Sequence, residues 1–371
     1  PLHRTARERH ARWQAICERA EHLQGSDVSA TVLVFDDRRW GDEPALHLNY
    51  LLNDRYCKLQ GLDFVFAGGP DWHDLVRMPP HWARIAHLQE LAMARPESSD
   101  SFLVSLDSDA VFANSRFSLK RLLAALPEEK SVFVAKDPPM WPPPQEWHAQ
   151  GVYCSGFALI RLDSAGRNFL TRWLAAFDST RWWQTEEGRW STDGKWAGSS
   201  YEQGQLNSLA HGDLAGVVLE LPQALFNSAF VRPEGEPQPV VVHLMRRPRE
   251  SPDAEKNRRV AATFFSLLRG EFTDESLRSS RLAGLSMCFE ASRRDERRQD
   301  SDDFCSVGDG VPRDVASLEA WEAEEERWWS PHQSPHPASP GCLSHENGDL
   351  EPLSVLYLER LCHLLQGAQS D

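Results

Sequence analysis

Two aspartates, Asp107 and Asp109, flank Ser108 directly after the apolar segment 102–106. Carboxylate oxygens are the ligands that hard divalent cations prefer, and a Mg²⁺ or Mn²⁺ ion held in this way typically bridges substrate phosphates. Asp and Ser also stabilise turns, so a solvated turn at the end of a strand is a second interpretation. The Asp-x-Asp pattern alone leaves both interpretations open.

His243 and the pair Glu202–Gln203 are further polar residues whose positions suit chemistry. His243 ends the apolar segment 240–243. An imidazole nitrogen there can ligate a metal, although a histidine after an apolar strand is more often structural. Glu202 and Gln203 open the helix expected over 201–210, where one of them could act as a base or stabilise an oxocarbenium-like transition state. The helix dipole alone also favours a carboxylate at this position.

The elements that must position these residues follow a regular alternation. Short apolar, β-branched segments predict strands over 31–35, 62–67, 102–106, 131–135, 151–161, 217–221 and 240–243. Helices are expected over 3–24, 44–60, 80–94, 118–126, 164–177, 201–210 and 255–268. The alternation predicts an α/β fold with a parallel sheet. Because ligands bind at the carboxyl ends of such strands, Asp36 and Asp107 mark the expected site.

The segment SFLVSLDSDAVFAN (101–114) resembles the metal-binding segment of glycosyltransferases with the GT-A fold. It is especially similar to the galactosyl/xylosyltransferase family, which includes galactomannan galactosyltransferases and xyloglucan xylosyltransferases. Other segments resemble this family or GT-A enzymes generally, in the same order: NDRYCKLQGLDF (53–64), HWARI (81–85), CSGFALIR (154–161), YEQGQL (201–206) and VVVH (240–243). The resemblance covers residues 30–270 and implies a GT-A, Rossmann-like α/β fold with a mixed, mainly parallel sheet flanked by helices.

This resemblance implies a glycosyltransferase that uses a divalent metal, Mn²⁺ or Mg²⁺. It assigns Asp109 as a direct metal ligand, Asp107 to the metal-bound water or the ribose, and His243 as the third metal-binding residue. The metal would neutralise charge that develops on the leaving diphosphate. Arg246 or Arg247 would add a guanidinium contact to the same phosphates.

The resemblance also implies the substrates and the catalytic residues. The expected donor is a UDP-hexose or UDP-pentose, the acceptor is a glycan or another hydroxyl compound, and the transfer retains anomeric configuration. Glu202 and Gln203 are the expected catalytic residues, although Glu202 stands where the family has Asp. Gly156 would allow close approach to donor or acceptor, with a plain strand bulge as the alternative. The expected donor-binding set is Asp36, Arg84, Asp107, Ser108, Ser155, Gly156, Arg246 and Arg247.

Two other functional classes remain open from the sequence. The residues from Asp107 to Val111 also fit the Asp-x-Asp-x-Thr/Val signature of haloacid-dehalogenase-type phosphatases, with Asp107 as the nucleophile. That signature usually opens its domain, whereas here three expected strands precede or include it. The departures at Tyr201 and Glu202 also permit a non-catalytic glycan- or nucleotide-binding protein on a GT-A scaffold.

The net charge of −15 over 371 residues is distributed unevenly. Residues 271–371 hold 21 acidic and 9 basic residues, whereas residues 1–270 carry a net charge of only −3. Because the chain has no basic excess to neutralise phosphates, nucleic acid is not an expected partner. The expected organisation is an N-terminal helical segment 1–28, a GT-A domain 29–270, and an acidic, partly disordered extension 271–371 with a helix over 350–365.

The hydropathy of the chain and the positions of its tryptophans allow two further predictions. No apolar run approaches the roughly 20 residues that a membrane-spanning helix needs, so no transmembrane segment is expected in this chain. The expected location is the Golgi lumen if an anchor precedes Pro1, and the cytoplasm otherwise. The Trp-rich segments 137–150 and 181–198 are expected to be loops, suited to stacking on sugars or to a small loop core. Trp82 is expected inside the protein, and Trp173 is expected on a helix.

Overall fold

The computed structural model describes residues 6–23, 27–38, 43–68, 77–137, 152–232, 238–245, 256–257, 259–264 and 267. Within these residues, no helix is both long enough and apolar enough to cross a membrane. Several expected features lie outside the described residues, namely the extension 271–371 with its helix over 350–365, almost all of the segment 137–150, and both Arg246 and Arg247. The proposed domain limits at residues 28 and 270 stay predictions.

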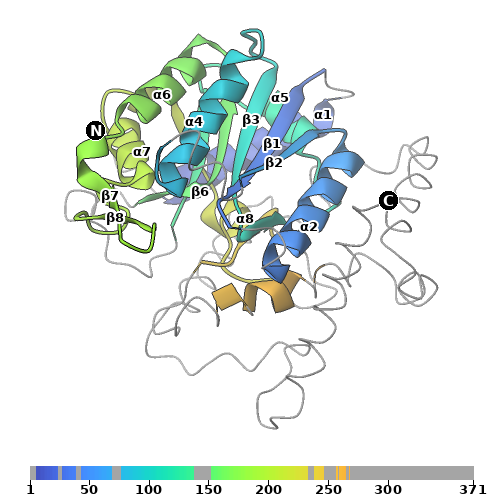
Figure 1. Ribbon diagram of the computed structural model, residues 1–371. Coiled ribbons are helices and arrows are strands. Elements are labelled where there is room, and N and C mark those ends of the chain that lie inside the picture. The colour runs from blue at the N-terminus through green and yellow to red at the C-terminus, as the bar shows by residue number, and fades with distance from the viewer. Residues whose placement is uncertain are drawn as a thin grey trace, which may run out of the picture.

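A six-stranded sheet, ordered β2-β1-β3-β6-β5-β9, forms the centre of the molecule (Figure 1). Its strands are β1 Ser29–Asp36, β2 Asp63–Gly68, β3 Ser101–Asp107, β5 Val132–Lys136, β6 Tyr153–Arg161 and β9 Val218–Leu221. β1 is parallel to β2 and β3, β5 is parallel to β9, and β6 is antiparallel to both β3 and β5. Five strands therefore share one direction, which confirms the predicted mixed, mainly parallel α/β sheet.

Side chains from successive strand residues fill both faces of this sheet. In β1, Val32 and Val34 belong to one apolar cluster, whereas Leu33 belongs to the cluster on the opposite face. Leu159 and Ile160 of β6 divide in the same way. Because strand side chains alternate in direction, a continuous apolar run is stable only where both faces are covered. This two-sided burial explains why the strands are visible in the sequence as uninterrupted apolar segments.

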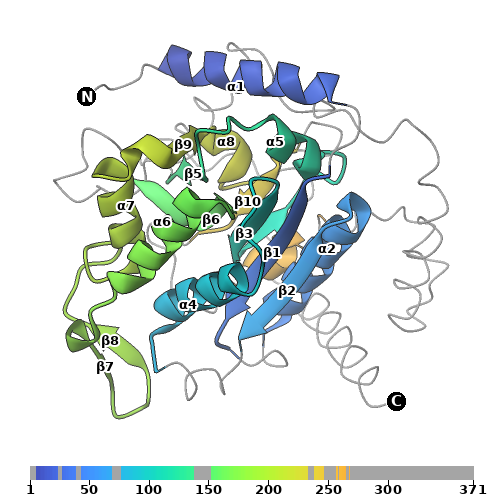
Figure 2. The same ribbon diagram turned by 90° about the horizontal axis from the view of Figure 1, so that it is seen from above.

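Helices cover both faces of the sheet, with α1 and α5 on one side and α4 and α6 on the other (Figure 2). The helices are α1 Ala6–His22, α2 Pro44–Gln60, α4 Pro80–Met93, α5 Leu119–Ala125, α6 Ser164–Ala175, α7 Glu202–His211 and α8 Gln223–Phe226, with 3₁₀ turns η3 Ser179–Arg181 and η4 Ala215–Val217. All helices predicted before residue 220 are present. The residues described between 256 and 267 are helical too, as predicted.

Helix α1 packs on the core through one apolar face. Trp13, Ile16, Cys17 and Ala20 are buried in the cluster that also holds β1 and β3 side chains. The Trp13 ring meets the Phe226 ring edge-on, with centroids 5.4 Å apart. The apolar positions recur every three to four residues, which places them along one side of a helix. A segment with very few apolar residues is thereby fixed to the sheet.

A small second sheet carries the turn that follows β3. β4 Ala110–Phe112 pairs antiparallel with β10 Val241–His243, and the register places the last residue of β10 opposite the first residue of β4. The N–H of Leu244 donates to the carbonyl of Asp109 at 2.9 Å. This pairing brings the predicted late strand and its histidine beside the Asp-x-Asp turn.

The segment 181–198 corrects the sequence prediction. The sequence predicts a loop, whereas the structure contains a hairpin of β7 Trp182–Gln184 and β8 Trp190–Thr192. Trp182 is buried, and its Nε1 donates to the carbonyl of Ser200 at 3.0 Å. Strands of only three residues are too short to produce a recognisable two-residue periodicity, so the pattern of residues could not reveal them.

Candidate metal centre

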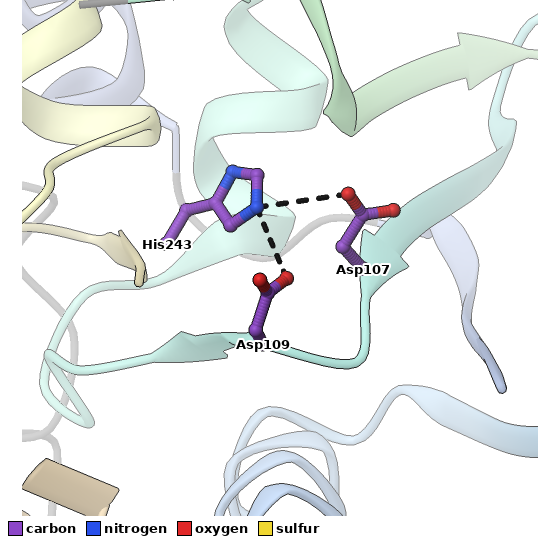
Figure 3. A group of neighbouring side chains, drawn as sticks. All are labelled: Asp107, Asp109 and His243. Atoms are coloured by element: carbon purple, nitrogen blue, oxygen red, sulfur yellow. Dashed lines mark ion pairs between the residues drawn. The ribbon is translucent and has the colours of Figure 1, made fainter. Parts of the chain in front are cut away.

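Asp107, Asp109 and His243 converge at the carboxyl end of β3 (Figure 3). The Nε2 atom of His243 lies 3.1 Å from Asp109 Oδ1 and 3.6 Å from Asp107 Oδ2. One potential ligand atom from each residue lies within 4.8 Å of the other two. β3 supplies Asp107, the following turn supplies Asp109, and β10 supplies the histidine. The structure therefore brings together the three residues that the resemblance assigns to a metal.

The chemistry of this group fits a divalent cation. Two carboxylates and one imidazole offer oxygen and nitrogen ligands, a combination that suits Mn²⁺ as well as Mg²⁺. The imidazole edge that carries Nε2 faces both carboxylates (Figure 3). Such metals commonly keep positions for substrate phosphates when the protein supplies only a few ligands. The three side chains are thus suited to hold a metal that also binds an anionic substrate.

Lys256 supplies a positive charge to one of the carboxylates. Its Nζ lies 2.6 Å from Asp109 Oδ2. Burial alone would raise the pKa of Asp109, but the charges of Lys256 and His243 outweigh burial and hold this pKa well below its ordinary value. The pKa of Lys256 is raised in turn, chiefly by the charge of Asp109. Asp109 therefore stays ionised and ready to bind a cation.

Gly156 of β6 lies directly against the same group. A Cβ atom at this position would lie 2.8 Å from Asp107 Oδ2 and would overlap the imidazole of His243. A glycine has no Cβ, so it permits this close approach. The role expected for Gly156 is contact with the donor or acceptor, and the structure gives it a further role in making room for Asp107 and His243.

Asp36, at the end of β1, is connected to the Asp-x-Asp turn through Ser108. The Ser108 hydroxyl donates to Asp36 Oδ2. Arg38 donates from Nε to Asp36 Oδ1 at 2.9 Å and from Nη2 to Oδ2 at 2.7 Å. Burial alone would lower the pKa of Arg38, but the hydrogen bond and charge of Asp36 raise it. Two strand ends are in this way joined by one polar network.

Arg84 of α4 is buried between two carboxylates. Its Nη1 pairs with Asp107 Oδ1, and its Nη2 lies 3.4 Å from Glu202 Oε1. The side chains of Arg84 and Glu202 are only 4% and 6% exposed, so neither charge is compensated by bulk water. A buried charge without its partner is strongly destabilising. Arg84 therefore ties helix α4 to the end of β3 and to the start of α7.

Glu202 opens α7, as predicted, and leaves one carboxylate oxygen unpaired among the described residues. Its Oε1 accepts from Ser155 Oγ at 2.9 Å and from Arg84. Its Oε2 is buried and has no hydrogen-bond partner in the described part of the chain. An unsatisfied buried acceptor costs roughly 1–3 kcal/mol, so it calls for an explanation such as a ligand that completes the bonding.

Gln203 enters the same network through Asp137, a residue that follows β5 and belongs to no motif in the sequence. Gln203 Nε2 donates to Asp137 Oδ2, and Gln203 Oε1 lies 3.4 Å from the Ser155 hydroxyl. Asp137 Oδ1 is buried without a hydrogen-bond partner among the described residues. Burial raises the pKa of Asp137. Polar side chains from the end of β5, from β6 and from α7 therefore meet beside the candidate metal centre.

Arg38, Lys256 and Asp137 border the site, although none of them belongs to a motif in the sequence. Arg38 had a usable signal, because it stands two residues after a carboxylate at a strand end. Lys256 had none, since it contacts Asp109 across a separation of almost 150 residues. The sequence instead assigns Arg246 and Arg247 as the late cations, and both lie outside the described residues.

Aromatic rings gather beside the N-termini of α4 and α7. The Trp196 ring is 63% exposed, and its centroid lies 5.3 Å from that of His81 and 5.0 Å from that of Tyr201. Tyr201 directly precedes the first residue of α7. Trp82 is fully buried, which confirms that it belongs to the core. Trp173 lies on helix α6, as predicted, and is fully buried as well.

The chain is similar to several solved structures of glycosyltransferases. One, involved in glycosylation of the major capsid of PBCV-1, shares 13% identity and a TM-score of 0.41, over 62% of this chain and 98% of that chain. GlyE of Streptococcus pneumoniae TIGR4 shares 12% identity and a TM-score of 0.37, over 65% and 62%. Mouse xyloside xylosyltransferase 1 shares 12% identity and a TM-score of 0.34, over 58% and 97%.

Neither a protein-family model nor a curated protein matches the chain. With identities of 12–13% to the solved structures, the assignment of a function depends on the side chains of the site itself.

Proposed function

We propose that this protein is a metal-dependent glycosyltransferase, which moves a sugar from a nucleotide-sugar donor to a hydroxyl group of a glycan or another acceptor. The observation that carries this proposal is the convergence of Asp107, Asp109 and His243 from three segments at the end of β3. Oxygen and nitrogen ligands at a strand end suit a divalent cation that also binds a diphosphate. The sequence resemblance points to the same three residues.

Asp109 and His243 are the proposed direct ligands of Mn²⁺ or Mg²⁺, with Asp107 beside them. A metal held there would act as a Lewis acid and would neutralise the charge that develops on the leaving diphosphate. Lys256 supports this role because it keeps Asp109 ionised. Arg84 supports it as well, because its ion pair with Asp107 Oδ1 leaves Oδ2 facing the imidazole of His243.

The proposed donor is a UDP-hexose or a UDP-pentose, bound along the ends of β1 and β3. We assign Asp36 and Ser108 to the nucleoside side of the donor, because Asp36 ends β1 and the Ser108 hydroxyl donates to Asp36 rather than to the three residues of the metal centre. Their hydrogen bonds with Arg38 hold them in one orientation before a ligand arrives. Fixed acceptors of this kind favour binding of hydroxyl and amide donors because less ordering remains to be done.

Glu202 and Gln203 are the proposed contacts of the transferred sugar. The unpaired Glu202 Oε2 is a ready acceptor for a sugar hydroxyl, and Ser155 and Arg84 hold the same carboxylate through Oε1. A carboxylate fixed close to the anomeric carbon would also stabilise the positive charge of an oxocarbenium-like transition state. Retention of configuration is the outcome expected from the sequence resemblance.

A donor screen tests this proposal. The purified chain is incubated with Mn²⁺ and a panel of nucleotide sugars, and release of nucleoside diphosphate is measured with and without simple sugar acceptors. We expect release from one class of donor, with loss of that release on chelation of the metal or in Asp109→Ala. Asp213→Asn, at an exposed ion pair on the surface, is the matched control. Absence of hydrolysis and transfer across the whole panel would contradict the enzyme assignment.

The same assays separate the other two classes. A phosphatase would hydrolyse a simple phosphomonoester, would lose that activity in Asp107→Asn, and would not bind sugar nucleotides. A non-catalytic binding protein would bind UDP with a metal and show no turnover with any donor. Binding of UDP by Asp109→Ala at the wild-type affinity would refute the metal assignment.

A further inference from the structure

Asn227 is buried directly behind the imidazole of His243. It follows helix α8, and its side chain is fully inaccessible to solvent. The N–H of His243 donates to the carbonyl of Ser228 at 2.7 Å, so the backbone beside Asn227 is fixed to β10. Asn227 Oδ1 lies 2.8 Å from the Nδ1 atom of His243. The backbone hydrogen bond between His243 and Ser228 therefore holds the Asn227 amide beside the imidazole.

The orientation of this amide is set by a second hydrogen bond. Asn227 Nδ2 donates to the carbonyl of Lys136 at 2.9 Å. A carbonyl can only accept, so the NH₂ group must face Lys136 and the amide oxygen must face His243. Because that oxygen also can only accept, the Nδ1 atom of His243 must carry a hydrogen. In the neutral imidazole, the lone pair then belongs to Nε2, which faces Asp107 and Asp109.

Cys154 is another neighbour of the same ring nitrogen. Its Sγ lies 3.7 Å from His243 Nδ1, and it accepts from the N–H of Gly156 at 3.3 Å. Burial and the charge of Asp137 raise the pKa of the Cys154 thiol, so the sulfur is uncharged. A thiol is a weak partner compared with an amide oxygen at 2.8 Å. Asn227 therefore determines which nitrogen of His243 is protonated.

We propose that Asn227 is a positioning residue, which fixes His243 in the tautomer and orientation that ligate a divalent metal through Nε2. This inference rests on the proposed function of Asp107, Asp109 and His243 as a metal site. Partners of this kind behind a ligating histidine typically change metal affinity by about 10–100-fold when they are lost. Asn227 does not touch the metal or the substrate in this proposal.

Two variants test the role of Asn227, one without and one with an acceptor oxygen for His243. Asn227→Leu keeps the approximate volume but removes the acceptor, whereas Asn227→Asp keeps an acceptor oxygen toward His243. Asn114→Leu is the matched control, because the buried Asn114 also donates to a backbone carbonyl, that of Gln238, away from the imidazole. Thermal unfolding of each variant shows whether it folds.

The primary measurement is Mn²⁺ affinity by calorimetry, on the full chain without substrate. We expect a loss of about tenfold or more in Asn227→Leu, and values near wild type in Asn227→Asp and Asn114→Leu. The second measurement is ¹⁵N NMR of the histidine rings without metal, with the His243 signals assigned by their loss in His243→Ala. It is made at a pH high enough to leave the ring neutral, because burial alone would lower the pKa of His243 but Asp109 and Asp107 raise it. We expect Nδ1 to be protonated in wild type and the hydrogen to move toward Nε2 in Asn227→Leu.

The outcomes separate this inference from the proposed function. If wild type binds Mn²⁺ and folded Asn227→Leu binds equally well with an unchanged tautomer, the role of Asn227 is refuted and the metal site stands. If wild type binds no divalent metal, the proposed metal site fails. In that case the NMR measurement alone decides whether Asn227 sets the tautomer, and an unchanged tautomer in Asn227→Leu refutes it.

Discussion

At residue 156, one added methyl group would enter the space that Asp107 and His243 occupy. We therefore expect Gly156→Ala to push these side chains apart and to weaken Mn²⁺ binding by about tenfold or more, with a lower melting temperature. Gly216→Ala is the control, because a Cβ atom there meets nothing within 4 Å. Calorimetric titration with Mn²⁺ checks the prediction, and equal affinity in the two variants would contradict it.

The buried Arg84 leads to a second prediction at the residue scale. Arg84→Met leaves Asp107 and the buried Glu202 without their shared cation, so we expect a loss of about 3–5 kcal/mol in the free energy of unfolding. Arg172→Met removes one side of an ion pair whose side chains are 42% and 63% exposed, and it should cost about 1 kcal/mol or less. Urea denaturation of both variants measures the difference. Similar costs would show that Arg84 is not the charge partner that its burial implies.

Asp107, Asp109 and His243 could be predicted because each stands at the end of an apolar strand, or just after it, within a segment that carries the resemblance. Their supporting residues could not be predicted in this way. Lys256 and Asn227 reach the site through contacts that are distant in sequence, and neither lies in a motif. Arg38 had a local signal that was not recognised, namely a base two residues after Asp36. Sequence reasoning thus finds groups that a short motif marks, and it misses partners that only the folded chain supplies.

At the scale of elements, helix α1 offers a direct test of how a highly charged segment docks. Trp13 is 2% exposed and packs on Phe226 at the end of α8. We expect Trp13→Ala to cost about 3–5 kcal/mol of unfolding free energy, because it leaves a large cavity between α1 and the sheet. Arg19→Ala, on the exposed side of α1, should cost less than about 0.5 kcal/mol. Urea denaturation at neutral pH measures both, and a small effect of Trp13→Ala would mean that α1 is not part of the cooperative unit.

The elements themselves were largely visible in the sequence. Strands such as β3 and β6 are buried on both faces, so their apolar runs are continuous and distinct from the helices between them. The reversed direction of β6 had no signal in its own residues, because burial on both faces looks the same for either direction. The hairpin of β7 and β8 was missed because its strands are short and rich in Trp and polar residues. Directions and short pairings depend on neighbours that a local pattern does not contain.

At the scale of the whole molecule, the dependence of stability on pH has a traceable contribution from His47 of α2. Burial lowers the pKa of His47 from 6.5 to about 4. As pH falls below 6.5 the unfolded chain takes up a proton first, so stability is fully present above pH 6.5 and declines toward pH 4, by roughly 3 kcal/mol from this group. His47→Gln should remove this part of the acid sensitivity.

The measurement for this prediction is the free energy of unfolding in urea at pH 7.5 and pH 5. We expect the difference between the two pH values to be smaller in His47→Gln than in wild type by roughly 2 kcal/mol. His22→Gln, at an exposed position of α1, should leave the wild-type difference unchanged. An equal pH difference in wild type and His47→Gln would show that His47 does not contribute.

The pairing of β10 with β4 also sets an order of events during synthesis. All six strands of the central sheet have been made once the ribosome has added residue 221. At that moment the nascent protein carries Asp107 and Asp109, but the imidazole at 243 and the ammonium at 256 have not been translated. The scaffold is therefore complete before the ligand set is, and the segment that finishes the cation-binding group emerges from the exit tunnel only after all six strands.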